Sequence, residues 1–128
     1  MELIIAMVIM AVLAAIAIPN YMAYIQRSNR AEARKQLLTI AIWMERRRTE
    51  NGGSYAGAVL PAMLQQSPPT GTAQYTIALP TLTATTFTAT ATAVGSMAGD
   101  ACTTLSIDHT GARTFTGAAA TQDICWNR

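Results

Sequence analysis

The first part of the chain is an apolar run followed by a polar segment. Residues 3–18 are all apolar, and no charged residue occurs between Glu2 and Arg27. As an α-helix, residues 3–26 extend about 36 Å at ~1.5 Å per residue, which exceeds the ~30 Å hydrocarbon core of a bilayer. The pattern therefore predicts an N-terminal helix that is long and apolar enough to cross a membrane.

The polar segment that follows has apolar residues at helical spacing. Its apolar positions recur at i, i+3, i+4 and i+7, which indicates an amphipathic helix. Because no helix breaker occurs between Pro19 and Gly52, we expect one continuous helix ending near Glu50. Its apolar stripe needs a partner, and the C-terminal region is the available one. The stripe comprises Ala33, Leu37, Ile40, Ala41 and Met44, widened by Leu38 and Ile42.

After residue 73 the pattern alternates with a period of two, which indicates β-strands. The first strand, "YTIAL", is interrupted by Pro80, and further strands are expected within "TLTATTFTATATAV", "CTTLSID" and "ARTFT". One long helix followed by about four antiparallel strands is an α+β plan, with the helix covering one face of the sheet. The residues expected on inward faces include Tyr75, Ile77, Leu79, Leu105, Ile107 and Phe115.

These patterns divide the chain into four parts. Residues 1–26 form the hydrophobic half of the helix, and residues 27–52 form its amphipathic half. Residues 53–72 form a loop region, in which we expect a short helical turn around residues 59–64. Residues 73–128 form the antiparallel sheet and a C-terminal region that is bounded by Cys102 and Cys125.

Charge is unevenly distributed along the chain, whose net charge is +2. Seven basic residues lie from Arg27 to Glu50, whereas only Arg113 and Arg128 are basic beyond Asn51. A surface that binds nucleic acid needs a dense basic patch, which this part of the sequence lacks. We therefore do not expect nucleic acid as a partner. The arginines at 46–48 are expected to be solvated or paired within the chain.

The threonine-rich tract has two interpretations. Residues 81–92 contain seven threonines, most of them alternating with apolar residues. Threonine suits the exposed face of a strand, and this is the preferred interpretation. The alternative is that the exposed threonines accept O-linked sugars.

The two cysteines, Cys102 and Cys125, suit a disulfide better than a catalytic role. The bridge would close a loop of 24 residues and stabilise a small domain by about 3 kcal/mol in the chain-entropy model. Together with an N-terminal membrane segment, such a bridge favours an exported protein.

The sequence offers no arrangement typical of an enzyme. His109 is the single histidine, so a histidine cluster for a metal or a proton relay lacks its second imidazole. Ser106, Asp108 and His109 are too close along the chain to adopt triad geometry. A glycine-rich phosphate loop is also missing. We therefore expect no catalysis, no small-molecule substrate, no metal and no cofactor.

Two simple explanations for the apolar segment are a cleaved signal peptide and a plain membrane anchor. Ala15-Ile16-Ala17 is a small-x-small pattern that would suit signal-peptide cleavage. Signal peptides begin with a basic region, however, and the charge ahead of this run is the negative Glu2. A plain membrane anchor explains the apolar run but gives no role to this carboxylate.

The stretch "ELIIAMVIMAVLAAIAIPNYMAYIQRSNRAEARKQLLTIA" resembles the N-terminal helix of type IV pilins. The shared features are a glutamate near the start, the apolar run ending in "AAIAIP", two tyrosines, and a basic, alanine-rich continuation. The helix exit "NGGSYAG" and the ending "DACTTLSIDHTGARTF…CWNR" are similar to those of minor pilins and short major pilins. The resemblance implies the type IV pilin fold, a long helix packed on an antiparallel sheet.

A pilin is a structural subunit of a filament. The resemblance implies an inner-membrane protein with a periplasmic head, which later enters an extracellular pilus used for adhesion, twitching motility or DNA uptake. Its partners would be other pilin subunits and the inner-membrane assembly platform. Two alternatives stay open, a type II secretion pseudopilin and a competence pilin that captures DNA. Pseudopilins usually hold calcium in an acidic loop, whereas the aspartates here are scattered, and a DNA-capturing head should carry exposed basic residues.

The resemblance also assigns roles in assembly. Glu2 would pair with the N-terminal amine of a neighbouring subunit and set the axial register. Pro19 would mark a kink where the helix loosens in the filament. Small side chains allow helices to approach closely. The residues expected in this helix packing are Leu3, Ala11, Ala14, Ala15 and Ala17.

The start of the chain departs from the pilin pattern. Pilin precursors begin with a short basic leader ending in glycine, followed by Phe-Thr-Leu and one further residue before the glutamate. Here Met1 stands directly before Glu2. We therefore expect that the leader and the first three mature residues are missing from this sequence. Prepilin peptidase would process the full-length precursor, and the new N-terminus would be methylated.

Overall fold

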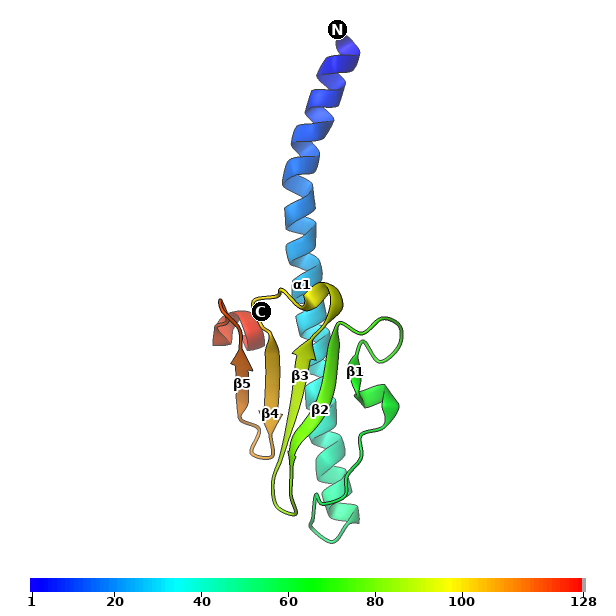
Figure 1. Ribbon diagram of the computed structural model, residues 1–128, viewed down its shortest axis with the longest axis vertical. Helices are drawn as coiled ribbons and strands as arrows, with labels where there is room; N and C mark the ends of the chain where they lie inside the picture. The colour runs from blue at the N-terminus through cyan, green and yellow to red at the C-terminus, as the bar shows by residue number, and fades with distance from the viewer. Residues whose placement is uncertain (128) are drawn as a thin grey trace.

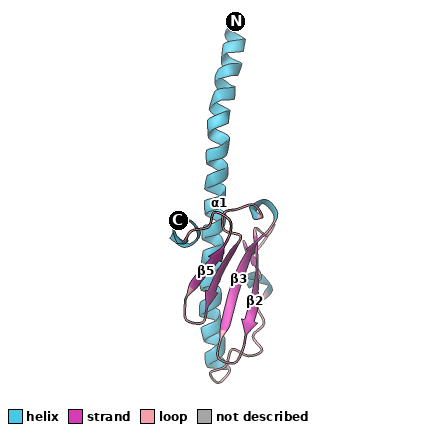
Figure 2. Ribbon diagram, turned by 60° about the vertical axis from the view of Figure 1, so that its left-hand side comes forward, coloured by secondary structure: helices cyan, strands magenta, loops and turns pink. Residues whose placement is uncertain are grey.

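A single long helix and a single antiparallel sheet make up the protein (Figure 1). The computed structural model describes residues 1–127. Helix α1 spans Glu2–Glu50; its first half projects alone, and its second half lies against the sheet in both ribbon views (Figures 1 and 2). We refer to residues 27–127 as the head.

The sheet has five strands in the order β1-β2-β3-β4-β5, with every neighbouring pair antiparallel. Three short helical turns complete the head: η1, η2 and η3. The strands are β1 (Gln66–Ser67), β2 (Tyr75–Leu82), β3 (Phe87–Ala93), β4 (Thr104–Asp108) and β5 (Arg113–Thr116). The turns are η1 (Ala62–Leu64), η2 (Gly95–Met97) and η3 (Asp123–Asn127).

The predicted stripe on α1 forms the helix side of the core. Leu37, Ile40 and Met44 have no solvent exposure. Full burial of such a side chain stabilises a fold by roughly 1.5–3 kcal/mol relative to exposure. The facing positions on β3 are Ala89 and Ala91, both fully buried, whose small side chains let the helix approach the sheet closely. The α+β fold expected from the sequence is therefore confirmed.

The stripe is narrower than the sequence predicted. Leu38 and Ile42 are 40% and 73% exposed, so the prediction that they widen the buried face is wrong. The sheet covers only one side of α1. The side chains of Leu38 and Ile42 lie outside the covered side and line an open groove. Arg113 and Trp126 form the opposite wall of the groove.

The sheet contains one strand more than the four predicted. Strand β1 pairs Gln66 with Thr76 and Ser67 with Tyr75, and it lies within the predicted loop region 53–72. Two residues are too few to show an alternating pattern, so this strand could not be predicted from periodicity. The helical turn predicted in the same region is present as η1.

Pro80 lies at an interruption in the pairing of the first long strand, as predicted, but it does not end the strand. Strand β2 continues to Leu82, and the pairing with β3 shifts register between Ala78 and Thr81. Proline has no N–H to donate, so it is accommodated where the ladder is irregular.

The neighbouring prediction, that the threonine tract forms an exposed strand face, is confirmed. Thr92 pairs with Thr76 on one side and Thr104 on the other.

Gly117 occupies a position that a larger residue cannot fill. Its φ is +147°, and a Cβ added there would lie 1.9 Å from the Ala101 carbonyl oxygen. We expect Gly117→Ala to lower the unfolding free energy of the head by about 2–4 kcal/mol, because backbone strain and overpacking act together. Urea unfolding followed by circular dichroism measures this change.

Gly99→Ala is the matched control for Gly117→Ala. Gly99 lies in the facing loop, and an added Cβ there meets nothing within 4 Å. We expect this variant to change the unfolding free energy by less than about 1 kcal/mol. Equal effects of the two substitutions would show that the close approach of Gly117 to Ala101 is unimportant.

Candidate functional site: the projecting helix and its junction with the head

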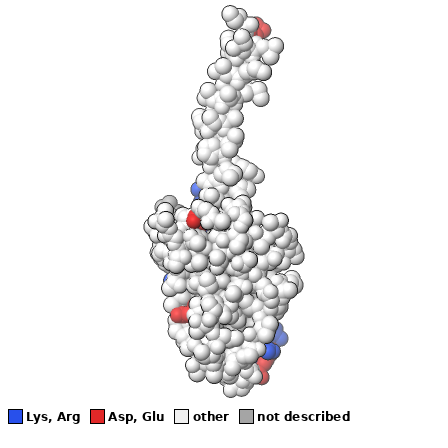
Figure 3. All heavy atoms as spheres, in the orientation of Figure 1, with Lys and Arg blue, Asp and Glu red and all other residues white. Residues whose placement is uncertain are grey.

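The projecting half of α1 is apolar and exposed on all sides. Every residue from 1 to 22 is exposed in the isolated chain, including Leu3 at 76% and Ile16 at 60%. Figure 3 shows this half as almost free of charge, with an acidic group at its tip and basic groups near the head. By length and composition, α1 qualifies as a helix that can cross a membrane. A soluble protein would not leave so much apolar surface without a partner.

The residues expected in assembly all lie on this projecting half. Glu2 is in the first turn of α1, and Pro19 lies inside the helix. Neither contacts the head, so their roles in register and in loosening remain predictions. The residues predicted for helix packing, all exposed, are Leu3, Ala11, Ala14, Ala15 and Ala17.

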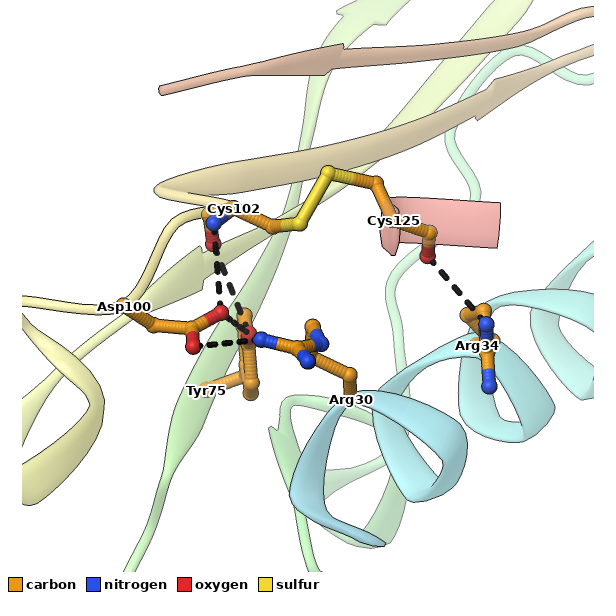
Figure 4. A network of polar contacts seen from close by, with 6 residues as sticks. All are labelled: Arg30, Arg34, Tyr75, Asp100, Cys102 and Cys125. Atoms are coloured by element: carbon orange, nitrogen blue, oxygen red, sulfur yellow. Dashed lines mark hydrogen bonds and ion pairs between the residues drawn. A yellow bond between two sulfur atoms is a disulfide. The ribbon is translucent and has the colours of Figure 1, made fainter. Parts of the chain in front are cut away.

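A buried ion pair joins α1 to the loop between η2 and β4, close to the point where the projecting half of the helix begins (Figure 4). Arg30 Nη1 lies 2.6 Å from Asp100 Oδ1, and the two side chains are only 9% and 1% exposed. The second carboxylate oxygen of Asp100 accepts a hydrogen bond from the Cys102 backbone N–H at 3.2 Å. A buried carboxylate is therefore held by both a cation and a backbone donor, which offsets its loss of hydration.

Tyr75 extends this cluster into the sheet. Its hydroxyl lies 3.4 Å from Asp100 Oδ2 and 3.4 Å from the Cys102 carbonyl oxygen. Burial, reinforced by the negative charge of Asp100, raises the pKa of Tyr75 well above its ordinary value. The hydroxyl therefore stays protonated and donates to this acceptor pair.

This cluster is not among the features predicted from the sequence. A signal was present, because Arg30 precedes Ala33 and Leu37 on the same helical stripe and is therefore placed on the buried face. A buried arginine needs a partner. The partner, Asp100, is 70 positions away, so only the folded structure identifies it.

The predicted disulfide between Cys102 and Cys125 is confirmed, with a Cα–Cα distance of 5.7 Å. It ties η3 to the segment that carries Asp100. Arg34 Nη1 donates to the Cys125 carbonyl oxygen at 3.4 Å, and Trp126 Nε1 donates to the Thr114 carbonyl oxygen at 3.1 Å. The C-terminal turn is thereby attached to α1 and to the edge strand β5. Burial, followed by the nearby charge of Arg30, lowers the pKa of Arg34.

A groove of about 430 Å³ runs between α1 and the β5 edge. Its basic residues are Arg34, Lys35 and Arg113, and the Arg113 guanidinium lies over the Trp126 ring at 5.3 Å from the centroid. The groove therefore has an apolar wall and several cations close together. Arg128, the other basic residue beyond Asn51, lies outside the described residues.

The arginines at the far end of α1 are paired within the chain, as expected. Arg46 Nε lies 3.0 Å from Glu50 Oε1, and Arg48 Nη1 lies 3.7 Å from Glu45 Oε2. Arg47 and Arg48 also lie over aromatic rings, those of Trp43 and Tyr55. Much of the positive charge here is therefore already neutralised.

The acidic residues of the head are also held locally. Asp108 accepts hydrogen bonds from the Thr110 hydroxyl at 2.6 Å and from two backbone N–H groups of its own turn. The hydrogen bond from Thr110 lowers the pKa of Asp108. Among residues 1–127, no group of three or more His, Cys, Asp or Glu side chains is placed to hold a metal ion.

Comparisons with known proteins agree with the resemblance seen in the sequence. The family model described as "Type IV minor pilin ComP, DNA uptake sequence receptor" matches residues 19–106, more than half of the chain. A comparison with curated proteins finds no match. The pilin family and fold are structural rather than enzymatic.

Two pilins are among the solved structures that are similar to this one. The minor pilin PilV of Neisseria meningitidis has a TM-score of 0.63 and 20% identity, covering 77% of this chain and 94% of that chain. A type IV pilin of Shewanella oneidensis has a TM-score of 0.52 and 27% identity, covering 79% of this chain and 97% of that chain. The chain therefore belongs to the ComP family of type IV minor pilins and is a structural subunit of a type IV pilus.

Proposed function

We propose that the subunit is first held in the inner membrane by residues 1–26, with its head in the periplasm. During assembly it then moves into an extracellular filament. The observation that carries this proposal is the fully exposed, apolar first half of α1. Such a surface is equally well covered by lipid or by other apolar helices, so transfer from one to the other exposes little apolar area to water. The other partners would be an assembly platform in the membrane and prepilin peptidase acting on the precursor.

Glu2 would favour the filament over the membrane. A carboxylate among lipid chains is unfavourable, whereas pairing with a positive group of a neighbouring subunit would stabilise it in the dry filament core. The small side chains at 11, 14, 15 and 17 would let the neighbouring helices come close enough for this pairing. Head-to-tail contacts that do not close into a ring generate a helical filament.

We expect Glu2→Ala to reduce the amount of this subunit in sheared pili by about tenfold or more, given the size of the insertion penalty that pairing would remove. Glu50→Ala is the control, because Glu50 lies at the far end of α1 and pairs only with exposed arginines. Quantitative mass spectrometry of pili and membranes measures both variants. Equal incorporation of Glu2→Ala and the unmodified chain would refute the assembly role of Glu2.

DNA binding is a second candidate function. Its support is the printed description of the matching family as a DNA uptake sequence receptor. The sequence alone argued against nucleic acid because only Arg113 and Arg128 are basic beyond Asn51. The groove changes that expectation, since it brings Arg34 and Lys35 of α1 beside Arg113 of β5. Three clustered cations are a small site for phosphate groups, whose contribution would depend strongly on salt.

Binding of duplex DNA to the full chain in detergent micelles tests this second function. We expect binding that weakens as the salt concentration rises. In the double variant Lys35→Gln/Arg113→Gln, the slope of the logarithm of the binding constant against the logarithm of salt concentration should fall by the amount that corresponds to about two phosphate contacts. The matched control is Arg46→Gln/Arg47→Gln, which removes two arginines that are paired elsewhere. Salt-insensitive binding, or an equal loss in the control, would contradict a DNA site in the groove.

A further inference from the structure

The end of the head from which α1 projects is formed by two loops and two short turns. Figure 1 shows η2 and η3 at this end, beside the helix. The Arg30–Asp100 ion pair and the Cys102–Cys125 disulfide hold these segments at the junction. We call residues 94–101 and 117–122 the rim.

The spacing along α1 places the rim close to the bilayer. The apolar half of the helix ends at Ile25, and Arg30, which holds the rim, follows five residues later. Five residues of helix extend about 7.5 Å. A bilayer of ~40–45 Å with a ~30 Å hydrocarbon core has a polar layer of about 5–8 Å on each side. When residues up to Ile25 lie in hydrocarbon, the rim therefore reaches the headgroup layer.

The exposed chemistry of the rim suits contact with that layer. Its one carboxylate, that of Asp100, is buried against Arg30 and does not face the membrane. The exposed carboxylate of Asp123 follows the rim in η3. The exposed rim residues are small or uncharged: Gly95, Ser96, Ala98, Gly99, Gly117, Ala118, Ala119, Thr121 and Gln122.

The nearest cations add a preference for anionic lipid. Arg27 is exposed on α1 one turn before Arg30, and Arg34 is half-buried one turn after it beside the Cys125 carbonyl. Basic residues at the membrane surface are attracted to anionic headgroups. Lys35 also lies here, 3.9 Å from Glu32. Among the described residues at this end, the three cations Arg27, Arg34 and Lys35 therefore outnumber the two carboxylates that solvent reaches, those of Glu32 and Asp123.

We propose that, before assembly, the rim rests among anionic lipid headgroups and holds the head at a fixed orientation on the membrane. The inference rests on the proposed residence of α1 in the membrane and adds a second contact to it. Ordering the head in this way presents the groove and the threonine-lined sheet face in one direction. Extraction into the filament then requires this contact to break.

The test uses the full chain in vesicles of phosphatidylethanolamine with phosphatidylglycerol, compared with vesicles of phosphatidylcholine. An environment-sensitive dye is attached to Ala118→Cys in the rim or to Thr85→Cys in the β2–β3 turn. Both positions are exposed, and Figure 1 shows the β2–β3 turn at the opposite end of the head. Lipids with a nitroxide on the headgroup quench dyes that touch the headgroup layer.

We expect several-fold stronger quenching at position 118 than at position 85, and stronger quenching at 118 in anionic than in neutral vesicles. Arg27→Gln should reduce this lipid dependence, and its exposed site leaves the fold intact. Equal quenching at the two positions, or quenching at position 118 that does not depend on lipid charge, would overturn the proposal. Co-flotation with vesicles reports membrane residence separately, so a failure of the rim contact is distinguishable from a failure of insertion.

Discussion

Asp100→Ala is expected to destabilise the head by about 3–5 kcal/mol, the largest effect of any single substitution considered. Removal of the carboxylate leaves the Arg30 side chain, which is only 9% exposed, without its ion-pair partner. The Cys102 N–H loses its acceptor as well, and the Tyr75 hydroxyl keeps only the Cys102 carbonyl oxygen. Thermal unfolding of the full chain in detergent should show a midpoint lower by more than about 10 °C.

The double variant Arg30→Met/Asp100→Ala separates the ion pair from simple packing. Methionine keeps much of the apolar stem of Arg30 but removes its charge, so no unpaired ion remains in the interior. We expect the double variant to be more stable than Asp100→Ala alone, because the two residues are directly coupled. A double variant that loses the sum of two independent effects would contradict the role assigned to this pair.

Loss of the disulfide is expected to have the second large effect. Cys102 and Cys125 are separated by 23 positions, and a loop of this size corresponds to about 3 kcal/mol in the chain-entropy model, within the 2–5 kcal/mol typical of small secreted domains. The bridge also fixes η3, from which Trp126 reaches the edge strand β5. Urea unfolding of the oxidised and reduced chain should therefore give clearly different midpoints.

The double variant Cys102→Ala/Cys125→Ala is the control for the reduction experiment. It should unfold at nearly the midpoint of the reduced chain and should not respond to reductant. An oxidised and a reduced chain with the same midpoint would show that the bridge contributes nothing to stability. In that case the hydrogen bonds of Arg34 and Trp126 would be sufficient to hold η3 in place.

The sequence predicts the helix and the main strands because both have a clear period. Ala33, Leu37, Ile40 and Met44 follow the helical spacing and are fully buried. The same pattern also included Ile42, which is 73% exposed. Periodicity gives the direction of an apolar face but not its width, which depends on how far the sheet extends beside the helix.

Features made by residues far apart in sequence were not predictable in this way. Strand β1 is two residues long and exists because Gln66 and Ser67 meet β2. The Arg30–Asp100 pair and the groove at Arg113 likewise need the folded arrangement of α1, the loops and β5. Glu2 was visible from the sequence alone, because a lone carboxylate at the tip of an apolar helix is energetically unusual.

The central claim is that the apolar half of α1 is covered by neighbouring subunits in a type IV pilus. Its most direct test is thiol labelling of sheared, lipid-free pili that carry Ala14→Cys or Thr85→Cys, using a water-soluble maleimide. Both residues are exposed in the isolated chain. We expect Thr85→Cys to react and Ala14→Cys to be protected. Equal labelling at the two positions, or absence of the chain from the pili, would contradict the claim.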